Sequence, residues 1–421
     1  MKILEVKNID RLVEKVLPKT PQKNKRIVES ILADVQKNGD RAVKKYEKKF
    51  AKASINSLRV TKSEIKQAYA KVSKKQITAI NIARNQLTKS ENSLKNSLKN
   101  SNLVTSSSRI DRKFIPISSV GCYIPSGLAR YPSSVIMSVV TAKIAGVKRI
   151  VAVSPPNENN KIDPLTLVAC DICGATEIYK TGGAQAIGAL AYGTKSIKNV
   201  DKIVGPGGSF VSIAKSLVSD TVSIDMIAGP TELGIIADTS VNPNLIVYDL
   251  FSQAEHSQDT FCFVITNSKK LAVSINKIIN KKIMNVNRSD IIKKSLSKNG
   301  LIVICKKQSD IITLANELAP EHLQIMIRSP KKLANKINNA GLILLGKRTP
   351  SALSDYLLGT NHILPTNRFS KVRGGLSVLD FMKLKTQVQA SNIRRTKAHL
   401  KELTDAEQLP NHYEAVRSRF K

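Results

Sequence analysis

The residues best suited to chemistry in this chain lie around its histidines. There are five of these, all in the C-terminal half: His256, His322, His362, His399 and His412. The stretch Asp249-Leu-Phe-Ser-Gln-Ala-Glu-His256 predicts the opening of a helix, because Asp249 can cap an N-terminus and good helix formers follow it. Gln253 and His256 are three residues apart and would project from one helical face. An amide oxygen and an imidazole nitrogen would then converge, as helix-borne metal ligands do.

A second candidate pair is Glu321-His322, which follows Ala319-Pro320. Proline at the start of a helix would place both side chains in its exposed first turn. An adjacent carboxylate and imidazole can act as general base and relay, with the carboxylate favouring the imidazolium form. The alternative is a helix cap beside a surface histidine.

A third group follows the predicted strand 342–345. Asp355 could supply an anionic oxygen to a metal, and His362 could bind a substrate carboxyl or amine. Both lie on the C-terminal side of a strand, where α/β sites assemble. Ordinary turn chemistry is the alternative. Glu407 and His412, five residues apart in the basic tail, carry no signal singly.

Taken together, these donors are nitrogen- and oxygen-rich and include no cysteine. Such a set suits Zn²⁺, with Mn²⁺ or Co²⁺ left open. Two glycine turns, Gly182-Gly-Ala-Gln185 and Gly205-Pro-Gly-Gly208, each follow a predicted strand and open a predicted helix. Glycine allows the backbone to approach a phosphate at the helix N-terminus, although ordinary βα turns would look the same. Neither turn is G-x-G-x-x-G, so the standard dinucleotide fingerprint is absent.

The elements that must position these residues alternate between strand and helix from Phe114 onward. This repetition predicts an α/β fold with parallel sheets, whose binding edge lies where the strands end. The predicted strands are 58–60, 120–124, 149–153, 177–180, 202–204, 233–237, 260–266, 301–305 and 342–345. The predicted helices are 24–38, 40–50, 63–98, 133–145, 164–173, 184–191, 208–218 and 310–318. The serines 106–108 suggest a linker, and a helical tail runs to His412.

Composition narrows the class of protein. No run of 18 apolar residues occurs, and Met1 to Asn8 lacks the apolar core of a signal peptide, so we expect a cytoplasmic protein without a membrane span. The odd count of five cysteines predicts reduced core thiols, with Cys170 and Cys173 on a buried helix surface. The net charge of +35 permits polyanion binding, but aromatic residues are only 4% and tryptophan is absent, so base-stacking platforms are scarce.

An ordered set of motifs resembles the histidinol dehydrogenase family along nearly the whole chain. These motifs are Gly121-Cys-Tyr-Ile-Pro125, Val139-Val-Thr-Ala-Lys-Ile-Ala-Gly146, Gly182-Gly-Ala-Gln-Ala-Ile187, Asp201-Lys-Ile-Val-Gly-Pro-Gly207, Asp225-Met-Ile-Ala-Gly-Pro-Thr-Glu232, Ser252-Gln-Ala-Glu-His256, Ala319-Pro-Glu-His-Leu323, Ser354-Asp-Tyr356 and Gly359-Thr-Asn-His-Ile-Leu-Pro-Thr366. The resemblance implies a zinc-dependent enzyme that uses two NAD⁺ to oxidise L-histidinol through L-histidinal to L-histidine, the last two steps of histidine biosynthesis.

The resemblance also implies roles for particular residues. It makes Glu321 and His322 the acid–base pair. The implied zinc ligands are Gln253, His256, Asp355 and His412, with His412 supplied by the other subunit. The implied substrate contacts are Thr231, Gln253, His256, His322, Asp355, His362, Glu407 and His412. The implied NAD contacts are Tyr123, Gln185 and Gly208.

The implied fold has two incomplete Rossmann-like domains with small terminal segments, in an intertwined homodimer. We expect an N-terminal arm at 1–22, a first domain formed by 23–110 and 235–375 with the metal and acid–base residues, and an NAD-binding domain at 111–234. The tail, 376–421, is too small for a core of its own, so we expect it to dock on the partner subunit.

Two positions depart from the pattern of the family. Gly208 stands where the family commonly has an asparagine that contacts NAD, so one hydrogen bond to the cofactor is expected to be missing. Thr231 stands where a serine usually contacts substrate, and its hydroxyl can still serve. Two other functions stay open at this point: a related NAD-dependent dehydrogenase of another amino alcohol, and a polyanion-binding α/β protein.

Overall fold

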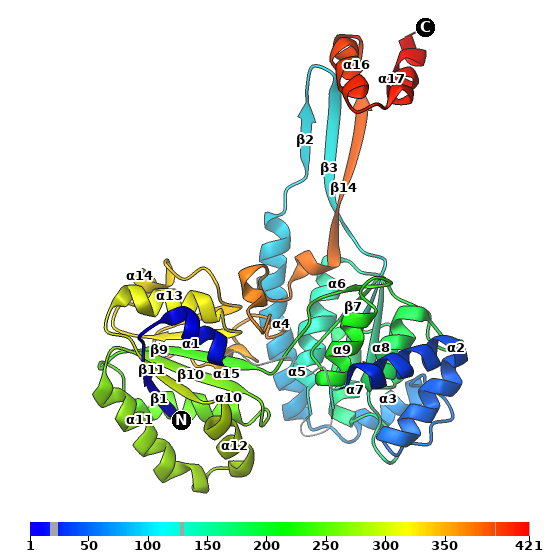
Figure 1. Cartoon of the computed structure of the whole chain (residues 1–421). Helices are drawn as coiled ribbons and strands as arrows, with labels where there is room; N and C mark the ends of the chain where they lie inside the picture. Colours follow the sequence, from blue (N-terminus) through cyan, green and yellow to red (C-terminus); the bar gives the residue numbers. More distant parts are fainter. Residues whose placement is uncertain (17–23, 127–129, 392, 421) are drawn as a thin grey trace.

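A computed structural model describes the chain except residues 17–23, 127–129, 392 and 421. The chain forms two lobes, each built on a parallel sheet flanked by helices, and a long antiparallel arm that projects from the body (Figure 1). Within the described part of the chain, no helix combines the length and the apolar character needed to cross a membrane. The two parallel sheets with their flanking helices confirm the predicted α/β class.

The first lobe is built on a five-stranded parallel sheet with the order β6-β5-β4-β7-β8. Its strands are β4 (Ser119–Tyr123), β5 (Arg149–Ser154), β6 (Glu177–Lys180), β7 (Lys202–Val204) and β8 (Ser223–Ile224). Its helices are α2 (Lys25–Phe50), α3 (Lys62–Tyr69), α4 (Lys74–Ser97), α5 (Pro132–Val135), α6 (Thr141–Ala145), α7 (Pro164–Cys173), α8 (Gly183–Tyr192) and α9 (Ser209–Leu217), with a π-helical stretch, Ile136–Val140, joining α5 to α6. Two apolar cores fill the two faces of this sheet, as the βα repetition predicts.

The second lobe is built on a six-stranded parallel sheet with the order β1-β11-β10-β9-β12-β13. Its strands are β1 (Lys2–Glu5), β9 (Glu232–Ala237), β10 (Phe261–Thr266), β11 (Leu301–Ile304), β12 (His322–Met326) and β13 (Leu342–Leu345). Its helices are α1 (Ile9–Val16), α10 (Pro243–Ala254), α11 (Lys269–Lys282), α12 (Ser289–Asn299), α13 (Gln308–Leu318), α14 (Pro330–Ala334) and α15 (Ser351–Ser354). Short 3-10 turns occur at Ile283–Asn285, Phe369–Lys371, Val378–Phe381, Ile393–Thr396 and Ser418–Phe420.

The structure corrects the predicted domain boundaries in two places. Segment 1–22 is not a free arm, because β1 pairs in parallel with β11 and α1 packs on α13. Helices α2 to α4 do not join residues 235–375, because they pack on α6 to α9 of the five-stranded lobe. The apolar face of α2, with Val28, Ile31 and Val35, is buried in the same core as Leu190 of α8. Burial of that face thus decides which sheet the N-terminal helices join.

Local signals explain where the helix predictions succeeded and failed. The break predicted at Gly39 is confirmed as a kink inside α2, where Gly39 has φ 51°. The single helix predicted over 63–98 is wrong, because capping boxes at Thr61 and Ser73 start two separate helices. The strand predicted at 58–60 is also wrong, since Arg59 forms only an isolated bridge to Tyr179.

The arm was not predicted from the sequence. It consists of β2 (Ser101–Val104), β3 (Ser108–Pro116) and β14 (Met382–Ala390), with α16 (Lys397–Ala406) and α17 (Pro410–Arg417) at its far end (Figure 1). Strand β14 pairs with β3 of the same chain from Met382 to Ala390. The predicted tail therefore begins inside its own subunit, anchored by the buried Val378 and Phe381. Of the serines 106–108, Ser106 and Ser107 lie in the turn between β2 and β3 and Ser108 begins β3, so they are not a linker.

Candidate active site

A cavity of about 1760 Å³ lies between the two lobes and takes its walls from opposite edges of the two sheets. The five-stranded sheet contributes the segments after the carboxyl ends of β4, β7 and β8. The six-stranded sheet contributes residues at the amino ends of its strands, among them Thr231, Phe261 and His322. The expectation that sites form where strands end is therefore right for the first sheet and wrong for the second.

Gln253 and His256 both line this cavity, but not at the start of a helix. Helix α10 begins after Asn242, whose side chain accepts a hydrogen bond from the backbone N–H of Asn244. The predicted cap at Asp249 is therefore wrong, since Asp249 lies inside the helix and accepts a hydrogen bond of 2.9 Å from Gln324 Nε2. Gln253 belongs to the last turn, and His256 follows the helix end.

Glu321 and His322 stand at the entry of β12, so the helix predicted there is wrong as well. Helix α13 ends at Leu318 because Ala319 takes a left-handed backbone conformation with φ 44°. The residues after Pro320 then pair with β9 on one side and β13 on the other, and every residue of β12 is buried. The sequence pair is adjacent, but it is placed by a central strand and not by an exposed helical turn.

A chain of hydrogen bonds holds the carboxylate of Glu321. Gln253 Nε2 donates to Thr231 Oγ1 over 2.6 Å, and the Thr231 hydroxyl donates to Glu321 Oε2. The backbone N–H of Glu232 donates to the same Glu321 oxygen over 2.8 Å. Two donors on one oxygen fix the orientation of the carboxylate.

The imidazole of His322 is buried between two carboxylates. Its Nε2 lies 3.3 Å from Asp355 Oδ1 and its Nδ1 lies 3.7 Å from Glu321 Oε2. Burial alone would lower the pKa of His322, but the negative charges of Glu321 and Asp355 outweigh it and raise the pKa to about 10. Both ring nitrogens are buried, and among the described residues neither makes a hydrogen bond of normal geometry in addition to these ion pairs.

Asp355 and His362 complete this wall of the cavity. Burial would raise the pKa of Asp355, but the neighbouring imidazoles of His322, His362 and His256 lower it overall, so the carboxylate stays ionised. His362 Nδ1 lies 2.8 Å from the backbone oxygen of Asp355. Burial lowers the pKa of His362, which favours its neutral form.

Three of the four predicted metal ligands line one cavity of the same chain. Gln253, His256 and Asp355 line the same cavity with an amide, an imidazole and a carboxylate. His412 lies on the exposed α17 at the end of the arm, far from the cavity, and Glu407 caps α16 nearby (Figure 1). Within the described residues of one chain, no group of three or more His, Cys, Asp and Glu side chains comes together that could hold a metal.

The predicted cofactor residues divide into two groups. Gly208 lines the cavity and precedes the first turn of α9. Tyr123 and Gln185 are buried beside the turn before α8. The Tyr123 hydroxyl accepts a hydrogen bond from the Gly183 N–H, and Gln185 Nε2 donates to Glu47. The described residues leave Gln185 Oε1 without a partner.

Sequence reasoning missed Glu232. It is buried at the head of β9, where its Oε2 accepts a hydrogen bond from the Glu321 N–H and its Oε1 accepts one from the Asn367 N–H. Burial, added to the charge of Glu321, raises the pKa of Glu232 to about 8. A charged residue that opens an otherwise apolar strand was the available signal.

All five cysteines are free and buried, as predicted. Their burial raises the pKa of Cys122 and Cys173 to about 12, which keeps these thiols unreactive. Cys170 and Cys173 lie in α7, where they contribute to the core of the five-stranded lobe. The candidate site therefore uses no sulfur ligand.

Comparison with known proteins agrees with the motifs. The family model for histidinol dehydrogenase matches residues 17–420. Histidinol dehydrogenase of Methanococcus maripaludis is 41% identical over 424 residues, covering 99% of each chain, and that of Oceanobacillus iheyensis is 40% identical, covering 94% of each. A solved structure of histidinol dehydrogenase from Elizabethkingia anophelis superposes with a TM-score of 0.94 at 32% identity and covers 100% of this chain and 98% of that one. This chain therefore belongs to the histidinol dehydrogenase family of oxidoreductases.

Proposed function

We propose that the chain catalyses the four-electron oxidation of L-histidinol, through L-histidinal, to L-histidine, with two NAD⁺ reduced. The main support is one arrangement: the fixed carboxylate of Glu321 and the ion-paired ring of His322 line a cavity whose opposite wall carries the Gly205–Gly208 turn. The bound dinucleotide would accept a hydride in each step. We place the reaction in the cytoplasm, because five buried free thiols suit a reducing compartment.

Each oxidation needs a group that removes a proton as hydride leaves the carbon. In the first, the alcohol loses H⁻ from carbon and H⁺ from oxygen, and we assign the proton to Glu321, with the positive His322 stabilising the developing oxyanion. In the second, water adds to the aldehyde and the hydrate loses H⁻ and H⁺ in the same way. We assign the proton of this water to Glu321 as well, because Thr231 and the Glu232 N–H hold one oxygen of its carboxylate in place and leave the other to act as base.

The donors that this chain supplies fit a divalent metal, although one ligand must come from elsewhere. Asp355 stays ionised beside His256, and together with Gln253 these side chains supply oxygen and nitrogen atoms of the kind that zinc accepts. Bound zinc would hold the imidazole and amine of the substrate and orient its alcohol carbon. We propose two further substrate contacts: Thr231 and His362, whose imidazole is neutral.

We infer that the missing ligand is His412 of the partner subunit in an intertwined homodimer. The arm that carries His412 and Glu407 projects from its own body and exposes apolar side chains, among them Leu384, Val388, Leu403 and Leu409. A second exposed apolar group lies beside the cavity and contains Tyr248, Leu353, Tyr356, Leu357 and Leu358. Exposed patches of this kind mark association sites, so we expect the partner's arm to cover this one.

The reaction is tested by counting NADH. Purified protein with zinc, NAD⁺ and L-histidinol should form two NADH for each histidinol, and a chelator or His256→Ala should abolish this. One NADH would mean that oxidation stops at the aldehyde, against the proposed second role of Glu321. No NADH from a folded, zinc-loaded dimer would overturn histidinol as substrate and point to another amino alcohol.

The shared site is tested by mixing two inactive variants. His256→Ala damages a site from its own chain, whereas His412→Ala damages the site of the partner subunit. A dimer with one copy of each therefore has one intact site and one doubly damaged site. Co-expression should restore about half of the activity per mixed dimer. Absence of any recovery, with mixed dimers present, would mean that each site uses its own His412.

A further inference from the structure

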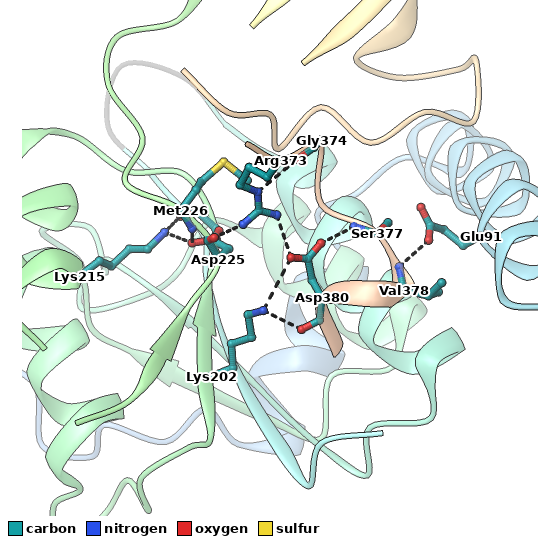
Figure 2. Close-up of polar contacts among 11 residues, drawn as sticks. Glu91, Lys202, Lys215, Asp225, Met226, Arg373, Gly374, Ser377, Val378 and Asp380 are labelled. Atoms are coloured by element: carbon teal, nitrogen blue, oxygen red, sulfur yellow. Dashed lines mark hydrogen bonds and ion pairs between the residues drawn. The ribbon is translucent and has the colours of Figure 1, made fainter. Parts of the chain in front are cut away.

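Besides the link from α1 to α2, which includes residues outside the described part of the chain, two stretches of chain connect the lobes. The first crossing, residues 225–231, joins β8 to β9. The second crossing, residues 346–381, returns from β13 to the base of the arm. A network of charges, buried at Lys215 and Asp225 and partly buried at the other members, fastens both crossings to the five-stranded lobe (Figure 2). We call it the crossing network and define it as Lys202, Lys215, Asp225, Arg373 and Asp380.

Asp225 and Lys215 hold the turn that opens into the cavity. Asp225 Oδ2 accepts the Gly205 N–H over 2.8 Å, and Lys215 Nζ donates both to Asp225 Oδ1 and to the Gly205 carbonyl, the latter over 3.0 Å. The side chains of this ion pair are almost fully buried. Gly205 has φ +117°, and a Cβ there would meet the Tyr123 carbonyl at 2.2 Å. The turn is therefore fixed at both the N–H and the carbonyl of a residue that must be glycine.

Arg373 joins the second crossing to the first. Its Nη1 donates to the backbone carbonyl of Asp225, and its Nη2 donates to Asp380 Oδ1 over 2.7 Å. Lys202 of β7 donates to the Asp380 carbonyl over 2.7 Å, which ties the same segment to the sheet. Figure 2 shows the guanidinium between the two aspartates, where it spans both crossings.

The first crossing also ends at the reacting groups. Asp225 holds Gly205 at one end, and Thr231 donates to Glu321 at the other. A displacement at Asp225 would therefore move the turn at Gly205 relative to Glu321. Oriented reactions are sensitive to such shifts, and a misplacement of about 1 Å can cost on the order of 100-fold in rate.

We propose that Arg373 is a positioning residue for hydride transfer: by fastening Asp225 to Asp380 it fixes the distance between the dinucleotide on the Gly205–Gly208 turn and the substrate beside Glu321. The proposal rests on the proposed function, since it concerns the same reaction. Arg373 contacts no residue assigned to zinc or substrate among the described residues, so its effect would act through the crossing. Segment 373–381 leads directly into β14, so the base of the arm is held by the same contact.

The test compares Arg373→Met with a matched arginine at the other edge of the same sheet. Arg149 also combines a carboxylate with backbone carbonyls: Nε lies 2.7 Å from Glu177 Oε1, and Nη1 and Nη2 donate to the carbonyls of Asn199 and Lys198. Its side chain is 21% exposed and that of Arg373 is 22% exposed. Arg149→Met therefore removes a comparable set of contacts away from the cavity.

The informative measurement is the primary isotope effect with histidinol deuterated at the alcohol carbon. We expect Arg373→Met to lower kcat by about 10- to 100-fold and to raise the isotope effect, because hydride transfer becomes slower, with the KM for histidinol little changed. Arg373→Lys should recover part of kcat, since an ammonium can reach only one of the two partners. Arg149→Met should lose comparable thermal stability without any change in isotope effect.

Two results would overturn the proposal, and they differ from failure of the proposed function. One is an Arg373→Met enzyme with unchanged kcat and isotope effect. The other is an equal fall in kcat for Arg149→Met, which would mean that general loss of stability is the cause. Wild-type protein that forms no NADH would instead remove the proposed function, and this inference with it.

Discussion

Two buried charged clusters lie within this molecule, and they differ in how completely the chain satisfies them. In the crossing network every charged group has a protein partner, with Asp225 and Asp380 each bound by cations and backbone N–H groups. In the site cluster, defined as Thr231, Glu321, His322 and Asp355, both ring nitrogens of His322 lack a hydrogen-bond partner among the described residues. These nitrogens lie 3.3 and 3.7 Å from the carboxylates of Asp355 and Glu321, so they are ion-paired without well-formed hydrogen bonds. Buried groups of this kind are common where a ligand completes the hydrogen bonding.

We infer that the crossing network positions the parts of the site, whereas the site cluster carries out the chemistry. A satisfied buried network gives rigidity, and here it fixes the Gly205 turn and the chain crossings. An unsatisfied cluster keeps its donors and acceptors available for a substrate whose charge changes during the reaction. The predictions that follow test this division.

The largest effect is expected at Glu321. Glu321→Gln should lower kcat by about 100- to 10,000-fold, because an amide cannot take the proton. Glu232→Gln is the matched control: burial and the charge of Glu321 raise the pKa of Glu232 to about 8, so this side chain is mainly neutral at pH 7 and an amide resembles its working form. Steady-state kinetics at pH 7 measure both. Equal losses from the two variants would contradict the assignment of the base to Glu321.

A large loss of stability is expected when the crossing network is broken on one side. Lys215→Met leaves Asp225 buried without its cation and should lower the free energy of unfolding by about 3–5 kcal/mol, as measured by urea denaturation. Lys45→Met, at an exposed pair with Asp34, should leave the free energy of unfolding almost unchanged, because solvent screens that pair. The double variant Lys215→Met/Asp225→Asn should recover part of the loss. No recovery would mean that Lys215 stabilises the fold through its packing alone.

The sequence predicted the parallel α/β class because each strand of the two sheets is short, apolar and followed by a turn signal. The arm was missed because β3 and β14 are far apart in sequence. Apolar and polar residues do alternate along β14, with Met382, Leu384 and Val388 at every second or fourth position, but this strand signal was not used. The prediction assigned α2 to α4 to the wrong lobe, because an amphipathic face shows that a helix packs but not on which sheet.

The residue types of the site were visible in the sequence, but their placement was not. Glu321 and His322 looked helical because Pro320 often opens helices, whereas pairing with β9 and β13 made a strand. Tertiary pairing overrides such local signals. Neither Glu232 nor Arg373 was predicted to have a role from the sequence. Each makes its key contact with a residue far away in the chain, 89 positions for Glu232 and 148 for Arg373. Contacts of that range require the fold.

A pH-dependent effect is expected at Glu91, beside the crossing network. Burial raises the pKa of Glu91 to about 7, with Asp380 adding to the shift and the Val378 N–H opposing it (Figure 2). A raised folded-state pKa contributes stability that is complete below the ordinary value and lost as pH rises through about 7. Glu91→Gln has no such loss, so its melting temperature should exceed that of wild type by an amount that grows from pH 5 to pH 8. The corresponding difference in the free energy of unfolding is at most about 3 kcal/mol.

Glu317→Gln serves as the control with opposite sign. Hydrogen bonding to Lys371 and the nearby positive charges lower the pKa of Glu317, so this group stabilises the protein above its ordinary pKa. The variant should therefore lose stability relative to wild type as pH rises, as followed by the same melting experiment. A Glu91→Gln difference that stays constant with pH would mean that the carboxyl is not held in its neutral form.

The smallest effect is expected at Gly208, where the family commonly has asparagine. A Cβ there meets nothing within 4 Å and the residue has φ −68°, so Gly208→Asn should fold without strain. One added hydrogen bond is worth about 0.5–1.5 kcal/mol, which predicts a KM for NAD⁺ lower by about 2- to 10-fold. Gly207→Asn is the control, because its Cβ would meet Val211 Cγ1 at 2.4 Å and distort the turn that the crossing network fixes. If Gly208→Asn raises only the melting temperature, the new side chain caps α9 instead of reaching the dinucleotide.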